Sequence, residues 1–258
     1  YRKIPVAQIG ADIFCDSRTI AAEIAALSGK PLLALENCDA EIRRYVESVD
    51  LEIFFACLMA SGSRTLGRKM WQSLSFFDLI RFIGDRIDIG RKATVKMMRY
   101  GEARPRVLAH LAATEARLQR QDFLFGPHPS HADFSTYHSL WFMRTLAESS
   151  LIDGFPRVMQ WLDRVQAFGH GHRREIPAEQ ALEIARTAVP RAIPDRDRAD
   201  PLQGRGVQIA PSDYGQVPTR GTLAGSTSST WILARTTDSG AATVHVHFPK
   251  SGYSLVPV

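Results

Sequence analysis

The sequence contains few cysteines and no long apolar segment. Only three of its 258 residues are cysteine, and Cys15, Cys38 and Cys57 form neither a CxxC pair nor a spacing typical of metal ligands. Sparse cysteines in an odd number are typical of a reducing compartment, where thiols behave as small apolar side chains. No apolar run approaches the roughly 20 residues that are needed to span a bilayer. We therefore expect a cytoplasmic protein without a transmembrane helix.

The chain also has little excess of either charge. Thirty-two lysines and arginines against 27 aspartates and glutamates give a net charge of +5, and 45% of the residues are hydrophobic. This ordinary globular composition excludes collagen-like and wholly disordered chains. The arginines of residues 190–206 alternate with aspartates, which is typical of a solvated linker rather than a nucleic-acid footprint. We expect neither a nucleic-acid nor a membrane partner.

Residues 1–35 have the pattern of a small unit of strands and one helix. Two short β-type runs, Ile4–Ile9 and Asp12–Phe14, are followed by a helical spacing over Ser17–Leu27. Such a unit is too small to bury a core by itself. Residues 36–189 repeat apolar side chains at helical spacing and end in a short helix over Pro177–Ala188, which predicts an all-α bundle.

The pattern changes again after Pro190. Residues 190–204 are charged and rich in proline, as in a linker, and residues 205–258 contain short β-type runs separated by glycine and serine. In the run that ends at Phe248, His245 and His247 alternate with valines, so we expect them on a solvated or interface face. The fold class expected is α+β and multi-domain: a partial N-terminal unit, a helical bundle and a small all-β module.

Pro5 and the Asp16-Ser17 pair are the residues most informative about function. A proline at the start of a strand cannot donate to the sheet, and next to a cis bond the neighbouring backbone groups can face an extended ligand. Asp16 and Ser17 open a helix, where unpaired N–H groups and the helix dipole favour a carboxylate. The aspartate can meet an ammonium group of the same ligand. This combination suits a γ-glutamyl peptide, although an N-cap alone would also explain Asp16.

The same residues resemble motifs of the glutathione S-transferase family. The resemblance lies in Lys-Ile-Pro-Val from Lys3, in Asp-Ser-Arg-Thr-Ile-Ala-Ala-Glu-Ile from Asp16, and in Ser-His-Ala-Asp from Ser130. It continues through Phe155-Pro156 to Trp161 and covers residues 1–189. Each motif is weak alone, but they occur together in the order of the family.

The resemblance implies a thioredoxin-like glutathione-binding domain over residues 1–35 and a family-type helical domain over 36–189. It implies that Asp16 and Ser17 bind the γ-glutamyl end of glutathione, that the Ile4 backbone beside a cis Pro5 pairs with the cysteinyl part, and that Lys3 contacts the glycyl carboxylate. Ser130 and Asp133 would form a structural capping box. A homodimer is also implied, with glutathione as co-substrate, a small electrophile as substrate and no metal.

The residue that activates the thiol cannot be assigned. In the family it lies in a strand-helix-strand segment ahead of the proline strand, and this sequence opens at Tyr1 without that segment. We expect the segment to be missing from these 258 residues, because an open sheet edge favours aggregation. The alternative is a non-catalytic member of the fold that uses the β module of residues 205–258 as an interaction surface.

Two further groups of residues have a less specific pattern. His128, His131 and His138 cluster near one helix start but have no metal-ligand spacing, so no metal site is expected. A group of apolar residues in the middle of the chain is expected mostly in the core, and pocket lining or dimer contacts are the alternatives. Its members are Trp71, Phe76, Phe77, Phe82, Met97, Met98 and Tyr100.

Overall fold

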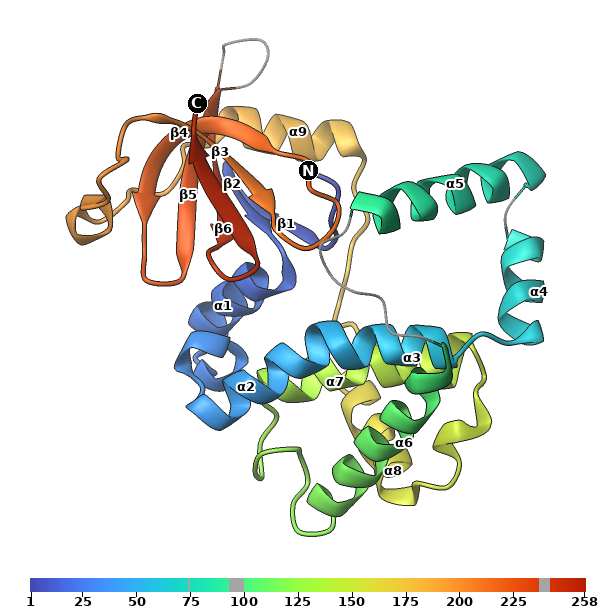
Figure 1. The fold of residues 1–258 in the computed structure, drawn as a ribbon. Coiled ribbons are helices and arrows are strands. Elements are labelled where there is room, and N and C mark those ends of the chain that lie inside the picture. Colours follow the sequence, from blue (N-terminus) through green and yellow to red (C-terminus); the bar gives the residue numbers. More distant parts are fainter. Residues whose placement is uncertain (74, 93–99, 237–241) are drawn as a thin grey trace. The chain divides into compact units, whose positions relative to one another are not determined.

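The computed structural model describes residues 1–73, 75–92, 100–236 and 242–258. Within them it contains α-helices and one seven-stranded sheet (Figure 1), which confirms the mixed α+β class. The chain divides into two compact units. The first contains Tyr1–Ile24 and Arg173–Val258, together with residues 88–92, and the second contains Ala25–Ile87 and residues 100–172.

The first unit is built around the sheet, whose strand order is β1-β2-β6-β5-β4-β3-β7. Strand β2 pairs in parallel with β6, and every other neighbouring pair is antiparallel. The strands are β1 (Val6–Ile9), β2 (Asp12–Cys15), β3 (Gly206–Pro211), β4 (Thr219–Ser226), β5 (Thr230–Thr236), β6 (Thr243–Pro249) and β7 (Tyr253–Pro257).

The two β regions that we expected as separate modules share this sheet. The β1–β2 hairpin offers the free edge of β2, and β6 pairs with it in a register that sets Ile13 opposite Val246. An unpaired strand edge presents unsatisfied N–H and C=O groups, which explains why the pairing is favourable. Apolar side chains from both regions then fill one core cluster: Cys15, Val207, Ile209, Leu223, Leu233, Val246, Phe248 and Tyr253.

Residues 177–204 also pack on this unit. Helix α9 (Ala178–Thr187), expected as the last helix of the bundle, accepts a 2.9 Å hydrogen bond at the Ala181 carbonyl from Gln8 of β1. In the expected linker, Ile193 is buried and lies so close to Gly225 of β4 that a Cβ there would be 2.8 Å from Ile193 Cγ2. The linker therefore contributes to the core of the unit, although its charged sequence predicted a solvated segment.

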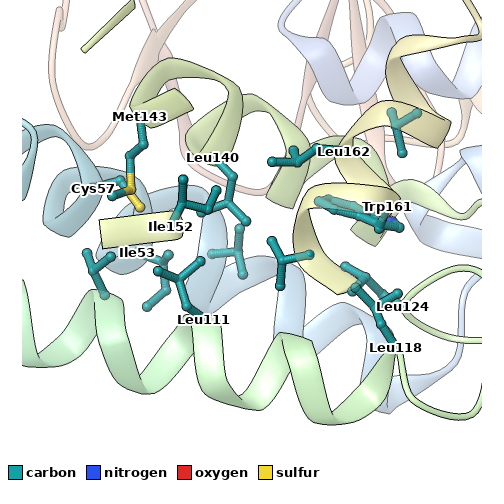
Figure 2. Packing of buried hydrophobic residues seen from close by; sticks show 14 of the residues in the cluster. Ile53, Cys57, Leu111, Leu118, Leu124, Leu140, Met143, Ile152, Trp161 and Leu162 are labelled. Carbon is teal, nitrogen blue, oxygen red and sulfur yellow. The ribbon is translucent and has the colours of Figure 1, made fainter. Parts of the chain in front are cut away.

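The second unit is a helical bundle, as expected. Figure 2 shows its core, in which apolar side chains including Leu111, Leu140 and Trp161 point toward one another. Helix α1 (Ser17–Ser28) leads into it from the first unit. Its other α-helices are α2 (Ala40–Ser48), α3 (Phe54–Ala60), α4 (Arg64–Ser73), α6 (Tyr100–Arg117), α7 (His131–Trp141) and α8 (Pro156–Gln166). Helix α5 (Phe76–Lys92) belongs to this unit up to Ile87, and its last residues belong to the first unit.

The capping box at the start of α7 is present. The backbone N–H of Ser130 donates to Asp133 Oδ2 at 2.9 Å, and the Ser130 side chain completes the reciprocal pair. Asp133 is fully buried and its Oδ1 also accepts from the Leu124 N–H at 2.9 Å and from Trp161 Nε1 at 3.0 Å. One carboxylate therefore joins the loop before α7, the start of α7 and the middle of α8.

The apolar residues of the middle segment are more exposed than expected. Trp71 of α4 and Phe77 of α5 are 62% and 76% exposed, and Phe76 and Phe82 are also exposed. They are not part of the buried core of the second unit. Met97 and Met98, together with the side chain of Tyr100, lie outside the described residues.

His110 of α6 makes the stability of the second unit dependent on pH. Burial, with a smaller contribution from Arg106, lowers the pKa of His110 to about 4. Because the unfolded chain binds a proton near pH 6.5 and the folded chain does not, stability is full above that pH and falls as the pH decreases. We expect a loss of about 2 kcal/mol between pH 7 and pH 5.

Chemical denaturation at a series of pH values measures this loss. His110→Gln should remove most of the slope between pH 7 and pH 5, whereas His128→Gln, which changes an exposed histidine, should retain it. An unchanged slope in His110→Gln would show that another group carries the pH dependence.

Candidate functional site

The structure brings Pro5, Asp16 and Ser17 together at the end of the hairpin. The β1–β2 register pairs Val6 with Cys15, so the residues just outside the hairpin, Pro5 and Asp16, face each other. The Asp16 N–H donates to the Pro5 carbonyl at 3.3 Å, and the Ile4–Pro5 bond is cis, as expected. Residues that are eleven positions apart in the sequence thus form one corner of the first unit.

Asp16 begins helix α1. Its carbonyl accepts the Ile20 N–H at 3.2 Å, and its side-chain Oδ1 accepts the Arg18 N–H at 3.1 Å. It is therefore an N-cap residue, and its φ of 81° is rare for a residue other than glycine. A left-handed backbone conformation of a residue other than glycine costs a free energy of order 1–2 kcal/mol. Residues with such a conformation occur preferentially at functional sites.

Ser17 and Ile4 flank this corner and are open to solvent. The Ser17 hydroxyl lies 3.5 Å from Asp16 Oδ1, at the first turn of α1. The Ile4 side chain is 90% exposed. An exposed hydroxyl at a helix N-terminus, next to a capping carboxylate, can bind both charged groups of an amino acid.

Lys3 has a partner that the sequence did not indicate. Its Nζ donates to both carboxylate oxygens of Asp213, at 2.6 and 2.8 Å, and lies 4.2 Å from the centroid of the Tyr214 ring. Both members of this ion pair are largely buried. A carboxylate of a ligand would therefore meet a neutralised lysine here, so the assignment of Lys3 to the glycyl end stays a prediction.

Asp16 is also bound by a tyrosine from the last strand. Tyr253 Oη donates to Asp16 Oδ2 at 3.0 Å, and Tyr1 Oη lies 2.7 Å from Tyr253 Oη. Because a carboxylate only accepts, Tyr253 uses its single hydrogen on Asp16, and Tyr1 must donate to Tyr253. Burial raises the pKa of both phenols above the usual value. In this arrangement neither hydroxyl has a hydrogen left to stabilise a thiolate.

Burial of the three cysteines disfavours the thiolate form. Burial raises the pKa of Cys15 and of Cys57 to about 12, and it also raises the pKa of Cys38. All three are buried free thiols. Because the thiolate is the reactive form, these side chains act as apolar core residues.

A second polar cluster lies between β2 and β6, and the sequence did not indicate it. The buried Asp12 accepts from His247 Nε2 at 2.8 Å and from the Arg191 N–H at 3.0 Å. His245 Nδ1 lies 4.0 Å from the same carboxylate. Of the two alternatives expected for this histidine face, solvated or interface, the solvated one was wrong: the side chains of His245 and His247 are 15% and 13% exposed, because β6 is an inner strand.

Burial lowers the pKa of both histidines, and Asp12 partly opposes this shift. The Phe14 ring stacks on His247 at 4.6 Å between centroids. No group of three or more histidine, cysteine or acidic side chains able to hold a metal ion occurs among the residues described. The contacts of Asp12 join the hairpin, the linker and β6.

The first unit also contains a cavity of about 810 Å³, beside the candidate site. It is lined mainly by apolar side chains of β1, β2, β6 and α9, including Val6, Ile13, Val246 and Leu182. Its charged lining residues are Arg186 and Arg235. This cavity is the alternative location for a ligand of the first unit, besides the corner at Asp16. Among residues 1–73, 75–92, 100–236 and 242–258, no helix is long and apolar enough to cross a membrane.

Comparison with known proteins identifies the family. Residues 97–164 match the family described as "Glutathione S-transferase, C-terminal domain". A solved GST-like protein from Pseudomonas syringae is 31% identical, with a TM-score of 0.74 over 99% of this chain and 82% of that one. A class Gtt2 glutathione S-transferase of Vibrio parahaemolyticus is 16% identical, with a TM-score of 0.41 over 64% and 69% of the two chains. A search of curated proteins gave no match. The chain belongs to the glutathione S-transferase family.

Proposed function

We propose that the protein binds glutathione at the corner formed by Pro5, Asp16 and Ser17 and transfers its thiolate to a small electrophile. The observation that carries the proposal is the position of Asp16, whose carboxylate caps α1 while its backbone N–H binds the carbonyl of Pro5. A γ-glutamyl peptide has a charged amino-acid end and an extended backbone, and this corner offers groups that suit both.

Each residue has a distinct role in this proposal. The Asp16 carboxylate binds the α-ammonium of the γ-glutamyl group, while the Ser17 hydroxyl and the first turn of α1 bind its α-carboxylate. The Ile4 backbone pairs with the cysteinyl part. In the reaction the thiol loses its proton to solvent or a base, a sulfur–carbon bond forms, and the leaving group departs with the electron pair of the broken bond. The protein contributes position and orientation of the thiolate.

One observation favours the second candidate, a non-catalytic binding protein of the same fold. The hydroxyl hydrogens of Tyr1 and Tyr253 are both used in hydrogen bonds, from Tyr1 to Tyr253 and from Tyr253 to Asp16. The thiolate would then lack stabilisation from these two groups. The two candidates differ in conjugation of glutathione to an aryl halide, which only the transferase accelerates above the uncatalysed rate.

Calorimetric titration of the intact chain with glutathione tests the proposal. We expect a dissociation constant of about 1 mM or lower, within the range common for enzyme substrates. Cysteinylglycine, which lacks the γ-glutamyl group, should bind at least about tenfold more weakly because it loses charge-assisted contacts. Equal affinity for the two peptides, or no heat with either, would contradict a glutathione site at Asp16.

We further propose a cytoplasmic homodimer. The family supports the dimer, and the three buried free cysteines are consistent with a reducing compartment. Sedimentation at several concentrations measures the oligomeric state, and a monomer at every concentration would contradict the dimer.

A further inference from the structure

The last strand of the sheet holds the carboxylate of the candidate site. Tyr253 is the first residue of β7 and is paired with Pro211 of β3. Its ring is buried in the core cluster of the first unit, 5.9 Å from the Phe248 ring. The backbone pairing and the buried ring together fix the direction in which the hydroxyl points, and that direction is toward Asp16 Oδ2.

Both oxygens of Asp16 are held, one from each side. Oδ1 accepts from the Arg18 N–H at the start of α1, and Oδ2 accepts from Tyr253 at the start of β7. A carboxylate has about four acceptor positions. The Ser17 hydroxyl, 3.5 Å from Oδ1, occupies a third position. One position therefore remains for an ammonium group, and the orientation of the carboxylate no longer has to be fixed when a ligand binds. Pre-orientation of this kind increases affinity by reducing the conformational entropy lost on binding.

Two further contacts join the same segments. Arg18 Nη1 donates to Ser251 Oγ at 2.6 Å, in the turn before β7. Lys3 is paired with Asp213, which follows β3. Lys3, Asp16 and Arg18 thus have side-chain partners among residues 213–253, and these contacts surround the corner at Pro5 and Asp16.

We infer that the C-terminal β strands complete the γ-glutamyl subsite, with Tyr253 as the positioning residue of Asp16. This inference rests on the proposed function and adds a role for a region that the family resemblance over residues 1–189 leaves unexplained. Tyr253 acts through Asp16 and does not touch the ligand, so its effect is specific for ligands with an α-ammonium group.

Tyr253→Phe is the variant that tests the inference, because it keeps the buried ring and removes only the hydroxyl. We expect glutathione binding to weaken by roughly tenfold, in the range for a hydrogen bond to a charged group. An analogue of glutathione without the γ-glutamyl amine should bind the variant and the wild type within about twofold, since it makes no contact that depends on Asp16.

A double-mutant cycle shows whether the effect passes through Asp16. In an Asp16→Asn background, Tyr253→Phe should change glutathione affinity by less than about twofold. Tyr45→Phe is the matched control, because it removes another largely buried tyrosine hydroxyl, 3.0 Å from Thr136 in the second unit. It should leave glutathione binding unchanged.

The outcomes separate this inference from the proposed function. If the wild type binds no glutathione, both are overturned. If the wild type binds and Tyr253→Phe binds equally well, or weakens glutathione and the analogue alike, only the role of Tyr253 is overturned. A measurement on the unsubstituted chain does not depend on the folding of the variant: with ¹³C-labelled tyrosine, glutathione should shift the Cζ resonance of Tyr253 and the analogue should not.

Discussion

Replacing Asp16 with alanine should weaken glutathione binding by about ten- to a hundredfold. A charge-assisted hydrogen bond contributes about 1.5–3 kcal/mol, and each 1.4 kcal/mol corresponds to a factor of ten in the dissociation constant. The substitution removes the carboxylate that faces the α-ammonium group and also leaves the Tyr253 hydroxyl without its acceptor. Calorimetric titration of the variant and the wild type measures the change.

Asp39→Ala provides the matched control. Asp39 caps α2 in the other unit, where its Oδ1 accepts the Ile42 N–H at 2.9 Å. Loss of either cap should lower the free energy of unfolding by about 1 kcal/mol. Only Asp16→Ala should lower glutathione affinity. Equal affinity in the wild type and Asp16→Ala would show that Asp16 is an N-cap and nothing more.

The second large effect concerns folding. Asp133→Ala should destabilise the protein by about 3–5 kcal/mol, because it leaves several buried donors without an acceptor. These donors are the Leu124 N–H, the Ser130 N–H and Trp161 Nε1, each 2.9–3.0 Å from the carboxylate. Urea unfolding followed by tryptophan fluorescence measures the loss.

Glu41→Ala controls for the removal of a carboxylate as such. Glu41 accepts from Arg117 at 3.0 Å but its side chain is 62% exposed, so its loss should cost about 1 kcal/mol or less. A similarly small loss in Asp133→Ala would contradict its role as the central acceptor of the bundle.

Local features of the fold could be predicted from the sequence. The hairpin, α1 and the Ser130–Asp133 capping box depend on residues that are close in sequence, and all three are present. The family resemblance implied a cis bond before Pro5, and this bond is present too. Short-range hydrogen bonds and apolar periodicity determine such elements, and both can be read from a single sequence.

The long-range contacts could not be predicted. Tyr253 is 237 residues from Asp16, and no spacing rule connects the first residue of a late strand to an early helix cap. The parallel pairing of β2 with β6 could not be predicted for the same reason. This pairing places Asp12 against His247. It also makes β6 an inner strand of the sheet, although its sequence pattern predicted one solvated or interface face.

Helix α9 and the linker show a different limit. The apolar stripe of an amphipathic helix predicts that it is covered, but not by which partner, so α9 read as part of the bundle. In the linker, the backbone N–H of Arg191 binds Asp12, and backbone donors leave no trace in a side-chain pattern.

The central claim is that glutathione binds at the corner of Pro5, Asp16 and Ser17. Amide chemical-shift mapping by NMR, with ¹⁵N-labelled intact chain and unlabelled glutathione, tests it most directly. The account predicts that the largest shifts occur at Asp16, Ser17 and Arg18, with smaller shifts at Ile4. Shifts confined to residues around the apolar cavity, such as Leu182 and Val246, or no shifts at all, would contradict it.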